Sequence, residues 1–388
     1  MRILYVITRS IHGGAQSHVV ELTRWLSATN EIAVLTGEPG FLADATAGFG
    51  AEVFTVPELV RSVLPHRDFM ATLKVRRIIQ HFKPDIIHAH CSKAGLIGRL
   101  AGWWTRVPTV YTAHGWRCAP GVAWGERLLA WPGEWVGARL SQHIITVSTW
   151  DYNIAVHCRI ADATRLALIH NGISNSPARS RNSARPEIVL VMVARFAPPK
   201  DHLLVMRALR GLPPHVRLLF VGDGPSLRNT QAQAIQLGVN HRISFLGQKA
   251  DVANILLEAD LLVLASNSEG LPISILEGLR AGLPVVTTDV GGVRDCVHDG
   301  VTGLVVPRGD VAALRNAISA LVDAPSLRAR MGAAGRQLYE RQFTAAHMVS
   351  RTYELYRRVA HEAAHPSVTE RQPPSREPAA DTATKGQC

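Results

Sequence analysis

The stretch Ser268-Glu269-Gly270-Leu271-Pro272-Ile273-Ser274-Ile275-Leu276-Glu277 carries two carboxylates separated by seven residues. It follows an apolar run, Leu261 to Ala265, that predicts a buried strand. Pro272 predicts the start of a helix, which Ala281-Gly282 ends. The N-terminus of a helix offers free backbone N–H groups and the positive end of a dipole, and both suit a phosphate. Carboxylates accept hydrogen bonds from sugar hydroxyls, so the stretch predicts a nucleotide-sugar site.

The whole chain alternates short apolar runs with helical segments, which predicts parallel α/β sheets. The first half has predicted strands at 3–8, 32–36, 53–56, 85–89, 109–113 and 143–147, with helices at 15–26 and 69–82. The second half has predicted strands at 188–193, 216–221, 243–245, 261–265, 285–287 and 303–306, with helices at 201–209, 225–236, 272–281 and 310–322. A polar, turn-rich segment, 174–186, predicts the linker. We expect two Rossmann-like domains that face each other across a cleft.

The C-terminal part of the sequence predicts one long helix and a tail. The helix runs over about 325–360, with a break near Phe343-Thr344. After Ala364 the composition is rich in Pro, Ser, Thr and Glu, which predicts disorder over 364–388.

Composition limits the cellular location and the class of protein. The chain has 388 residues and five scattered cysteines without a CxxC pair, which indicates a reducing compartment and no structural zinc. No apolar run reaches the roughly 18 residues that a membrane span needs. Met1 to Thr8 is predicted to be a core strand and not a signal peptide. The cytoplasm, at the inner face of the cytoplasmic membrane, is the expected location.

Residues 59–139 combine positive charge with tryptophan. This segment holds twelve Lys/Arg against four Asp/Glu, and six of the eight tryptophans, although the net charge of the whole chain is only +11. Indole rings and cations suit the headgroup region of an anionic membrane. The alternative is a set of core tryptophans beside a solvated basic face. Nucleic acid is not expected as a partner, because no matching motif accompanies the charge.

Two cations follow the first strand of the second half. Arg195 comes just after that strand and Lys200 starts the next helix, so both should reach the crevice at the carboxyl edge of the sheet. There they could neutralise a pyrophosphate leaving group. An ordinary surface pair is the alternative, and the pair Glu269 and Glu277 argues against it.

Several glycine turns are weaker signals. Gly13-Gly14 follows the first strand and allows the backbone to approach a ligand closely, although GxGxxG is absent. Gly222 lies in Val221-Gly222-Asp223-Gly224-Pro225, and Gly247 follows Phe245-Leu246, where the backbone could read the edge of a base. For each of these, a plain tight turn is the alternative.

Histidines gather near two strand ends of the first half. His114 follows Tyr111-Thr112-Ala113 and can reach a substrate hydroxyl or shuttle a proton. His88 and His90 share one face of a strand, and two ligands without a third do not predict a metal site. We interpret His88 and His90 as packing or cleft-lining residues.

These motifs together resemble the GT-B retaining glycosyltransferases of family 4. The resemblance rests on Glu269-x7-Glu277, Arg195 with Lys200, Gly13-Gly14, Val221 to Pro225, Phe245 to Gly247 and Ala281 to Val286, and it extends in order from about residue 2 to 360. Tyr111 to Trp116 resembles members that build bacterial exopolysaccharide, capsule or O-antigen on a lipid carrier. The resemblance implies an acceptor domain over 1–174, a donor domain over 187–344, and a C-terminal helix, about 345–361, that crosses back to the first domain.

The resemblance also implies roles for individual residues. Arg195 and Lys200 would hold the donor diphosphate, Glu277 the ribose hydroxyls, and Glu269 the hydroxyls of the transferred sugar. His114 would contact that sugar, and the backbone at Gly14 and at Gly270-Leu271-Pro272 would contact phosphate oxygens. Gly222 and Gly247 complete the expected donor site. Such enzymes keep the anomeric configuration and need no metal or cofactor, with a UDP- or GDP-sugar as the donor substrate.

Two other functions remain open from the sequence. A nucleotide-sugar 2-epimerase on the same architecture would release UDP and an altered sugar without an acceptor. A non-catalytic, membrane-associated scaffold of a polysaccharide complex would not need Glu269, Glu277, Arg195 or Lys200.

Overall fold

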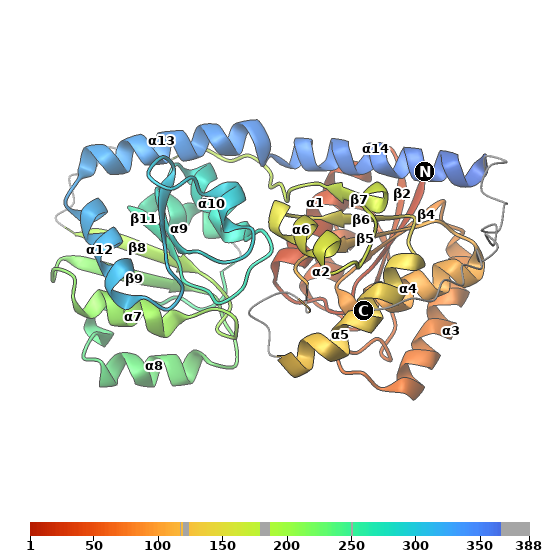
Figure 1. The fold of residues 1–388 in the computed structure, drawn as a ribbon, viewed down its shortest axis with the longest axis horizontal. Helices are drawn as coiled ribbons and strands as arrows, with labels where there is room; N and C mark the ends of the chain where they lie inside the picture. Colours follow the sequence, from red (N-terminus) through yellow and green to blue (C-terminus); the bar gives the residue numbers. More distant parts are fainter. Residues whose placement is uncertain (117, 119–123, 179–186, 250, 366–388) are drawn as a thin grey trace, which may run out of the picture.

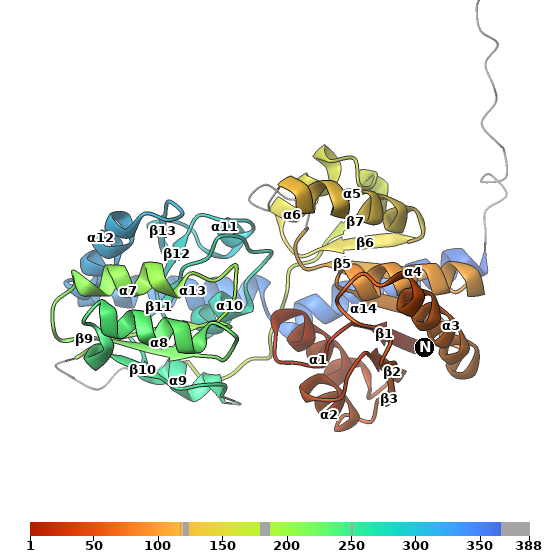
Figure 2. The ribbon, with the colours of Figure 1, turned by 90° about the horizontal axis from the view of Figure 1, so that it is seen from below.

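Strands rich in Val, Ile and Leu form two separate parallel sheets in the computed structural model (Figure 1). The structure describes residues 1–116, 118, 124–178, 187–249 and 251–365. Helices cover both faces of each sheet, as Figure 2 shows from below. This arrangement confirms the predicted pair of Rossmann-like units. Residues 179–186 of the predicted linker 174–186, and residues 366–388 of the predicted tail 364–388, lie outside the described residues.

The first sheet has seven strands in the order β3-β2-β1-β4-β5-β6-β7. Its strands are β1 (Arg2–Val6), β2 (Glu31–Thr36), β3 (Glu52–Thr55), β4 (Ile86–His90), β5 (Thr109–Ala113), β6 (His143–Thr146) and β7 (Leu166–Leu168). Its helices are α1 (Gly14–Leu26), α2 (Phe41–Ala47), α3 (Pro65–Phe82), α4 (Ser92–Thr105), α5 (Trp124–Arg139) and α6 (Thr149–His157). β1 pairs with both β2 and β4, so the strand order reverses at β1 and the loops after β1 and β4 diverge.

The second sheet has six strands in the order β10-β9-β8-β11-β12-β13. Its strands are β8 (Ile188–Val193), β9 (Val216–Val221), β10 (Ile243–Phe245), β11 (Leu261–Leu264), β12 (Val285–Thr288) and β13 (Gly303–Val306). Its helices are α7 (His202–Arg210), α8 (Leu227–Gln236), α9 (Val252–Glu258), α10 (Ile273–Ala281), α11 (Val293–Cys296) and α12 (Val311–Val322). The strand order of this sheet reverses at β8, which lies between β9 and β11. A crevice is expected at the carboxyl edge of the sheet at this point.

Side chains on the two faces of β1 enter two different cores. Leu4 and Val6 pack into one apolar cluster, whereas Ile3, Tyr5 and Ile7 pack into the other. This alternation follows from the two-residue period of a strand, and a parallel strand buried on both faces is apolar at every position.

Two long helices end the described chain. α13 (Pro325–Gln342) packs on α10, and α14 (Ala345–Ala364) begins after Phe343-Thr344, where the break was predicted. Thr344 caps α14 by accepting a hydrogen bond from the backbone N–H of His347. Met348, Leu355 and Tyr356 are buried in the same cluster as Ile3 and Tyr5. α14 therefore packs on the first sheet, along which it runs in Figure 1.

Three details differ from the sequence-based expectation. Pro272 is the N-cap of α10, with φ −73° and ψ 118°, and not its first helical residue. β7 is only three residues long and was not predicted, because so short a run carries no clear period. The helices α2, α4, α5, α6, α9 and α11 were also not predicted, since they are short or their apolar spacing is less regular than that of α1 and α3.

Candidate donor-binding cleft

The loop between β11 and α10 carries Glu269 to the cleft between the two halves. Buried β11 ends at Leu264, and the chain then runs over the carboxyl edge of the sheet to the N-cap Pro272, after which α10 begins at Ile273. A Cβ on Gly270 would lie only 2.7 Å from the carbonyl oxygen of His114, so this loop touches the end of β5 in the first half. Glycine at position 270 permits that approach.

Lys200 and Glu269 form an ion pair between two loops of the second half. The Lys200 ammonium donates a hydrogen bond to Oε1 of Glu269, and their side chains are 18% and 10% exposed. A backbone bridge between Lys200 and Ser266 also holds the loop after β8 against the loop after β11. The predicted cation and acid are thus in direct contact, and both residues line the cleft.

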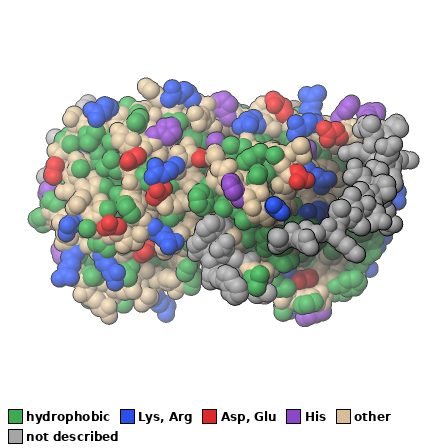
Figure 3. All heavy atoms as spheres, in the orientation of Figure 1, with side chains coloured by type: hydrophobic (Ala, Val, Ile, Leu, Met, Phe, Trp, Pro, Cys, Tyr) green, Lys and Arg blue, Asp and Glu red, His purple; other side chains and the backbone are tan. Residues whose placement is uncertain are grey.

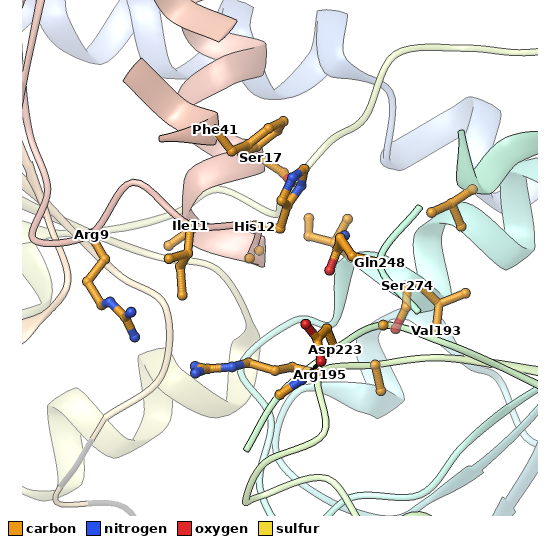
Figure 4. Close-up of a pocket in the computed structure, with 18 of the residues that line it drawn as sticks. Arg9, Ile11, His12, Ser17, Phe41, Val193, Arg195, Asp223, Gln248 and Ser274 are labelled. Atoms are coloured by element: carbon orange, nitrogen blue, oxygen red, sulfur yellow. Dashed lines mark hydrogen bonds between the residues drawn. The ribbon is translucent and has the colours of Figure 1, made fainter. Parts of the chain in front are cut away.

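Arg195 lies exposed on the cleft wall. The structure gives it no ion pair with any described residue. In Figure 4 its side chain extends from the second half toward Arg9 of the first half. Arg9 itself pairs with Glu38 at 3.1 Å. An unpaired guanidinium in a cleft is suited to bind an anion such as a diphosphate.

Glu277 lies in α10, on the same cleft wall as Glu269. Burial raises the pKa of its carboxyl group from 4.5 to about 7, and nearby Arg280 only partly offsets this effect. Among the described residues, no hydrogen-bond partner is found for the Glu277 carboxyl group, and Arg280 acts on it only through its charge. Ligand hydroxyls could supply the missing hydrogen bonds.

The first half contributes the opposite wall. Gly14 begins α1, and its missing side chain leaves its backbone close to Ile273 of α10. The ring of His12 stacks on Phe41, with centroids 3.8 Å apart. Figure 4 shows both rings on the side of the cleft that lies opposite Gln248 and Ser274.

His114 reaches the cleft from the end of β5 and belongs to a group of four histidines. His90 Nδ1 lies 3.2 Å from His114 Nε2, and the His18 ring is 5.1 Å from the His114 ring. The ring of His88 lies against that of His90, with centroids 4.0 Å apart and the ring planes tilted by 42°. Burial lowers the pKa of all four histidines, and that of His18 falls to about 4. This group was not predicted from the sequence, although His88 and His90 share one face of a strand and His114 follows a neighbouring strand.

The two halves also meet where α11 and the residues before it approach the start of α6 and His170. Oδ2 of Asp295 accepts hydrogen bonds from the backbone N–H of Thr149 at 2.6 Å and pairs with Nε2 of His170 at 3.1 Å. A Cβ on Gly292 would lie 2.3 Å from the Cβ of Ser148. Close packing and the Asp295 carboxylate therefore both contribute to the contact between the two halves.

The cleft has a volume of about 1290 Å³ and brings together most of the predicted residues. Those that line it are Gly14, His114, Arg195, Lys200, Gly222, Glu269, Gly270, Leu271, Pro272 and Glu277. Gly247 does not line it, whereas its neighbours Gln248 and Lys249 do, and the Gly247 carbonyl accepts a hydrogen bond from Gly222 N–H. The described residues hold no group of three or more His, Cys, Asp or Glu that is arranged to bind a metal ion.

Two family models match consecutive parts of the chain. Glycosyltransferase Family 4 matches residues 12–176, and Glycosyl transferases group 1 matches residues 176–338. The chain is 26% identical over 311 residues to the UDP-Gal:alpha-D-GlcNAc-diphosphoundecaprenol alpha-1,3-galactosyltransferase of Escherichia coli, with 76% of this chain and 80% of that protein covered. It is 27% identical to the O-antigen biosynthesis glycosyltransferase WbnH of Escherichia coli, with 76% and 83% covered.

The solved structures show the same fold. The crystal structure of Anabaena Alr3699/HepE in complex with UDP and glucose superposes with a TM-score of 0.81 at 21% identity, covering 92% of this chain and 100% of that one. The two family models together cover residues 12–338, the first from β2 to β7 of one parallel sheet and the second from β8 to β13 of the other. The chain therefore belongs to the GT-B glycosyltransferases of group 1 and family 4.

Proposed function

We propose that this glycosyltransferase moves a sugar from a UDP-sugar to a lipid-linked or saccharide acceptor, with retention of the anomeric configuration, in the synthesis of a cell-surface polysaccharide. The observation that carries the proposal is the single cleft in which Lys200, Glu269, Arg195 and Glu277 face His114. That cleft offers cations, acids and free backbone N–H groups, which a diphosphate and two sugars need together.

The second half would bind the donor. Arg195 and Lys200 would hold the diphosphate with the N-terminus of α10, and Glu277 would accept hydrogen bonds from the ribose hydroxyls. Glu269 would bind hydroxyls of the transferred sugar, which lies toward His114. Gly222 and the backbone beside Gly247 would lie against the nucleoside. Uridine is favoured as the base, because the Escherichia coli relative uses UDP-Gal and HepE was solved with UDP and glucose.

The chemistry would depend on charge stabilisation at the leaving group. The bond between the anomeric carbon and the diphosphate breaks, and the acceptor oxygen bonds to that carbon from the same face. The acceptor proton passes to a phosphate oxygen of the departing UDP. Arg195 and Lys200 would stabilise the growing negative charge on this diphosphate, which is the main contribution that such a preorganised site makes to the rate. No step requires a metal or a cofactor.

The acceptor would bind to the first half, and a membrane would present it. Helices α3, α4 and α5 expose large apolar side chains, among them Phe69 (60%), Trp103 (64%) and Trp104 (44%). The guanidinium of Arg76 lies 4.5 Å from the ring of Trp104, so cations accompany the indoles. Figure 3 shows hydrophobic side chains on the half of the molecule where Figure 1 places these helices. Among the described residues, no helix has both the length and the hydropathy that crossing a bilayer requires.

A donor panel followed by a transfer assay tests the proposal. UDP- and GDP-sugars are first ranked by the rise in melting temperature that each produces, since a ligand of the native state stabilises it by mass action. The best donor is then incubated with polyprenyl-diphosphate saccharides, and release of nucleotide is measured for the wild type and for Glu277→Ala.

Each outcome distinguishes one of the alternatives. Acceptor-dependent release of UDP that Glu277→Ala abolishes supports the proposal. Release of UDP and an altered free sugar without any acceptor would assign an epimerase. A chain that binds no nucleotide sugar at all would instead be a scaffold.

A further inference from the structure

His90 and His114 are joined by a hydrogen bond whose donor depends on the tautomer of each ring. Nδ1 of His90 lies 3.2 Å from Nε2 of His114, so one of these nitrogens carries the shared proton. Burial lowers the pKa of both imidazoles well below 6.5, with the neighbouring histidines adding to the effect, and each ring is therefore neutral at pH 7. A neutral imidazole has one N–H and one bare nitrogen. The assignment of the shared proton thus fixes the tautomer of both rings.

The other nitrogen of His90 decides between the two tautomers. His90 is fully buried, and its Nε2 has no hydrogen-bond partner. If His114 donated to His90, the His90 proton would have to sit on Nε2, as a buried N–H without an acceptor. Orphaned buried donors are rarer in proteins than under-satisfied acceptors, and each costs free energy. The favoured arrangement has His90 Nδ1–H donating to His114 Nε2, with His90 Nε2 bare.

His18 shows the same pattern in the same cluster. Nδ2 of Asn171 donates to the carbonyl oxygen of Leu271 at 3.0 Å, so the oxygen of that amide must face His18. His18 Nδ1 lies 3.0 Å from this oxygen and must therefore be the donor. Nε2 of His18 is then bare, and it too is buried without a partner. A bare buried nitrogen is thus already present beside His114.

A row of contacts holds His90 in place. The ring centroid of His88 lies 4.0 Å from that of His90. Nε2 of His88 lies 2.7 Å from the hydroxyl oxygen of Thr112, and Nδ1 of His88 contacts the hydroxyl of Tyr356. Tyr356 belongs to α14. The ring of His90 can therefore not turn without disturbing a packed layer that extends to the last helix.

We propose that His90 is a positioning residue that holds His114 as the neutral tautomer with its proton on Nδ1. Nδ1 of His114 has no protein partner among the described residues, and His114 lines the cleft. His114 then presents an N–H donor to the transferred sugar and does not act as a base through that nitrogen. This inference rests on the proposed donor site, which places the sugar at His114.

The tautomer can be measured directly in the wild-type protein. Two-bond ¹H–¹⁵N correlation spectra of protein labelled at histidine nitrogens distinguish the two neutral tautomers, and His114→Asn identifies the signals of residue 114. We expect the Nδ1–H pattern in the protein alone and with UDP bound. An Nε2–H pattern or an imidazolium at pH 7 overturns the proposal, and it does so whether or not the chain transfers sugar.

Three variants at position 90 separate positioning from packing. His90→Asn keeps a donor close to the place of Nδ1, His90→Leu fills the space without a donor, and His90→Asp offers only an acceptor. The rate of sugar transfer is measured with the UDP-sugar that stabilises the protein most in the panel. We expect His90→Asn to retain at least about a third of kcat, and the other two to lose about tenfold or more, with little change in the Kd of UDP.

The contrast among these variants decides the question. If His90→Leu and His90→Asn lose kcat equally while both remain folded, His90 only packs and the proposal fails. His215, an exposed histidine before β9, gives a control in His215→Asn, which should change neither kcat nor the His114 signals. Loss of activity in His114→Asn tests the donor site itself, so failure of the proposed function and failure of this inference are distinguishable.

Discussion

Replacing Glu277 by Gln should make the free protein more stable and the donor bind more weakly. Burial raises the pKa of Glu277 from 4.5 to about 7, so the folded protein binds this proton more tightly than the unfolded chain does. The contribution of protonated Glu277 to the free energy of unfolding is fully present below about pH 4.5 and is lost as pH rises through 7. Above pH 7 the buried, ionised carboxylate destabilises the folded protein, and the uncharged Gln side chain removes this destabilisation.

The structure sets the size of both effects. A shift from 4.5 to about 7 corresponds to at most about 3 kcal/mol, and opening of the site to cleft water reduces this to about 1–2 kcal/mol. For domains of this size the melting temperature of the Gln variant should rise by about 2–6 °C at pH 8. Loss of charged hydrogen bonds to ribose should weaken UDP binding about tenfold to a hundredfold.

Thermal melts from pH 5 to pH 9, with and without UDP, test both effects. The stability gain of the Gln variant should shrink toward pH 5, and UDP should stabilise the wild type more. Glu52→Gln, at an exposed position of β3, is the matched control and should change neither. Equal melting temperatures at pH 8 together with equal stabilisation by UDP would refute the assigned burial and role of Glu277.

Three further changes test other parts of the structure. Lys200→Ala should weaken UDP binding about tenfold or more in calorimetry, because it removes a diphosphate cation and leaves Glu269 uncompensated, and unchanged affinity would argue against the site. Asp295→Asn should lower the melting temperature by a few degrees, because Asp295 accepts a hydrogen bond from Thr149 and pairs with His170 across the two halves. An unchanged melting temperature would mean that this contact does not stabilise the fold. Trp103→Ser should reduce sedimentation with anionic liposomes at low salt, whereas Trp25→Ser on α1 should not, and equal loss in both would place the membrane contact elsewhere.

Much of the fold could be predicted because its strands are buried on both faces. Runs such as Ile188 to Val193 are apolar at every position, which marks parallel strands, and β8 has the predicted bounds. The break at Phe343-Thr344 was also evident, since a capping threonine interrupts the helical pattern there. β7 was not predictable in this way, because three residues carry no period.

Part of the site could also be predicted from the sequence, and part could not. Residues within one motif, such as Glu269 and Glu277, could be placed from the sequence because a strand and a helix fix their spacing. The contact of His90 with His114 depends on β4 lying beside β5 in register, with His90 opposite Thr112. Sequence spacing alone does not give that register. The donor loop at Gly270 likewise meets His114 only through the packing of one half on the other.

A crystal structure of the protein with a bound UDP-sugar would show whether Arg195, Lys200, Glu269 and Glu277 bind one donor together. We predict that the diphosphate lies within hydrogen-bond distance of Arg195 and Lys200, that Glu277 binds the ribose, and that the sugar lies between Glu269 and His114. A UDP-sugar bound in another crevice, or in this cleft with its diphosphate away from both cations, would contradict it.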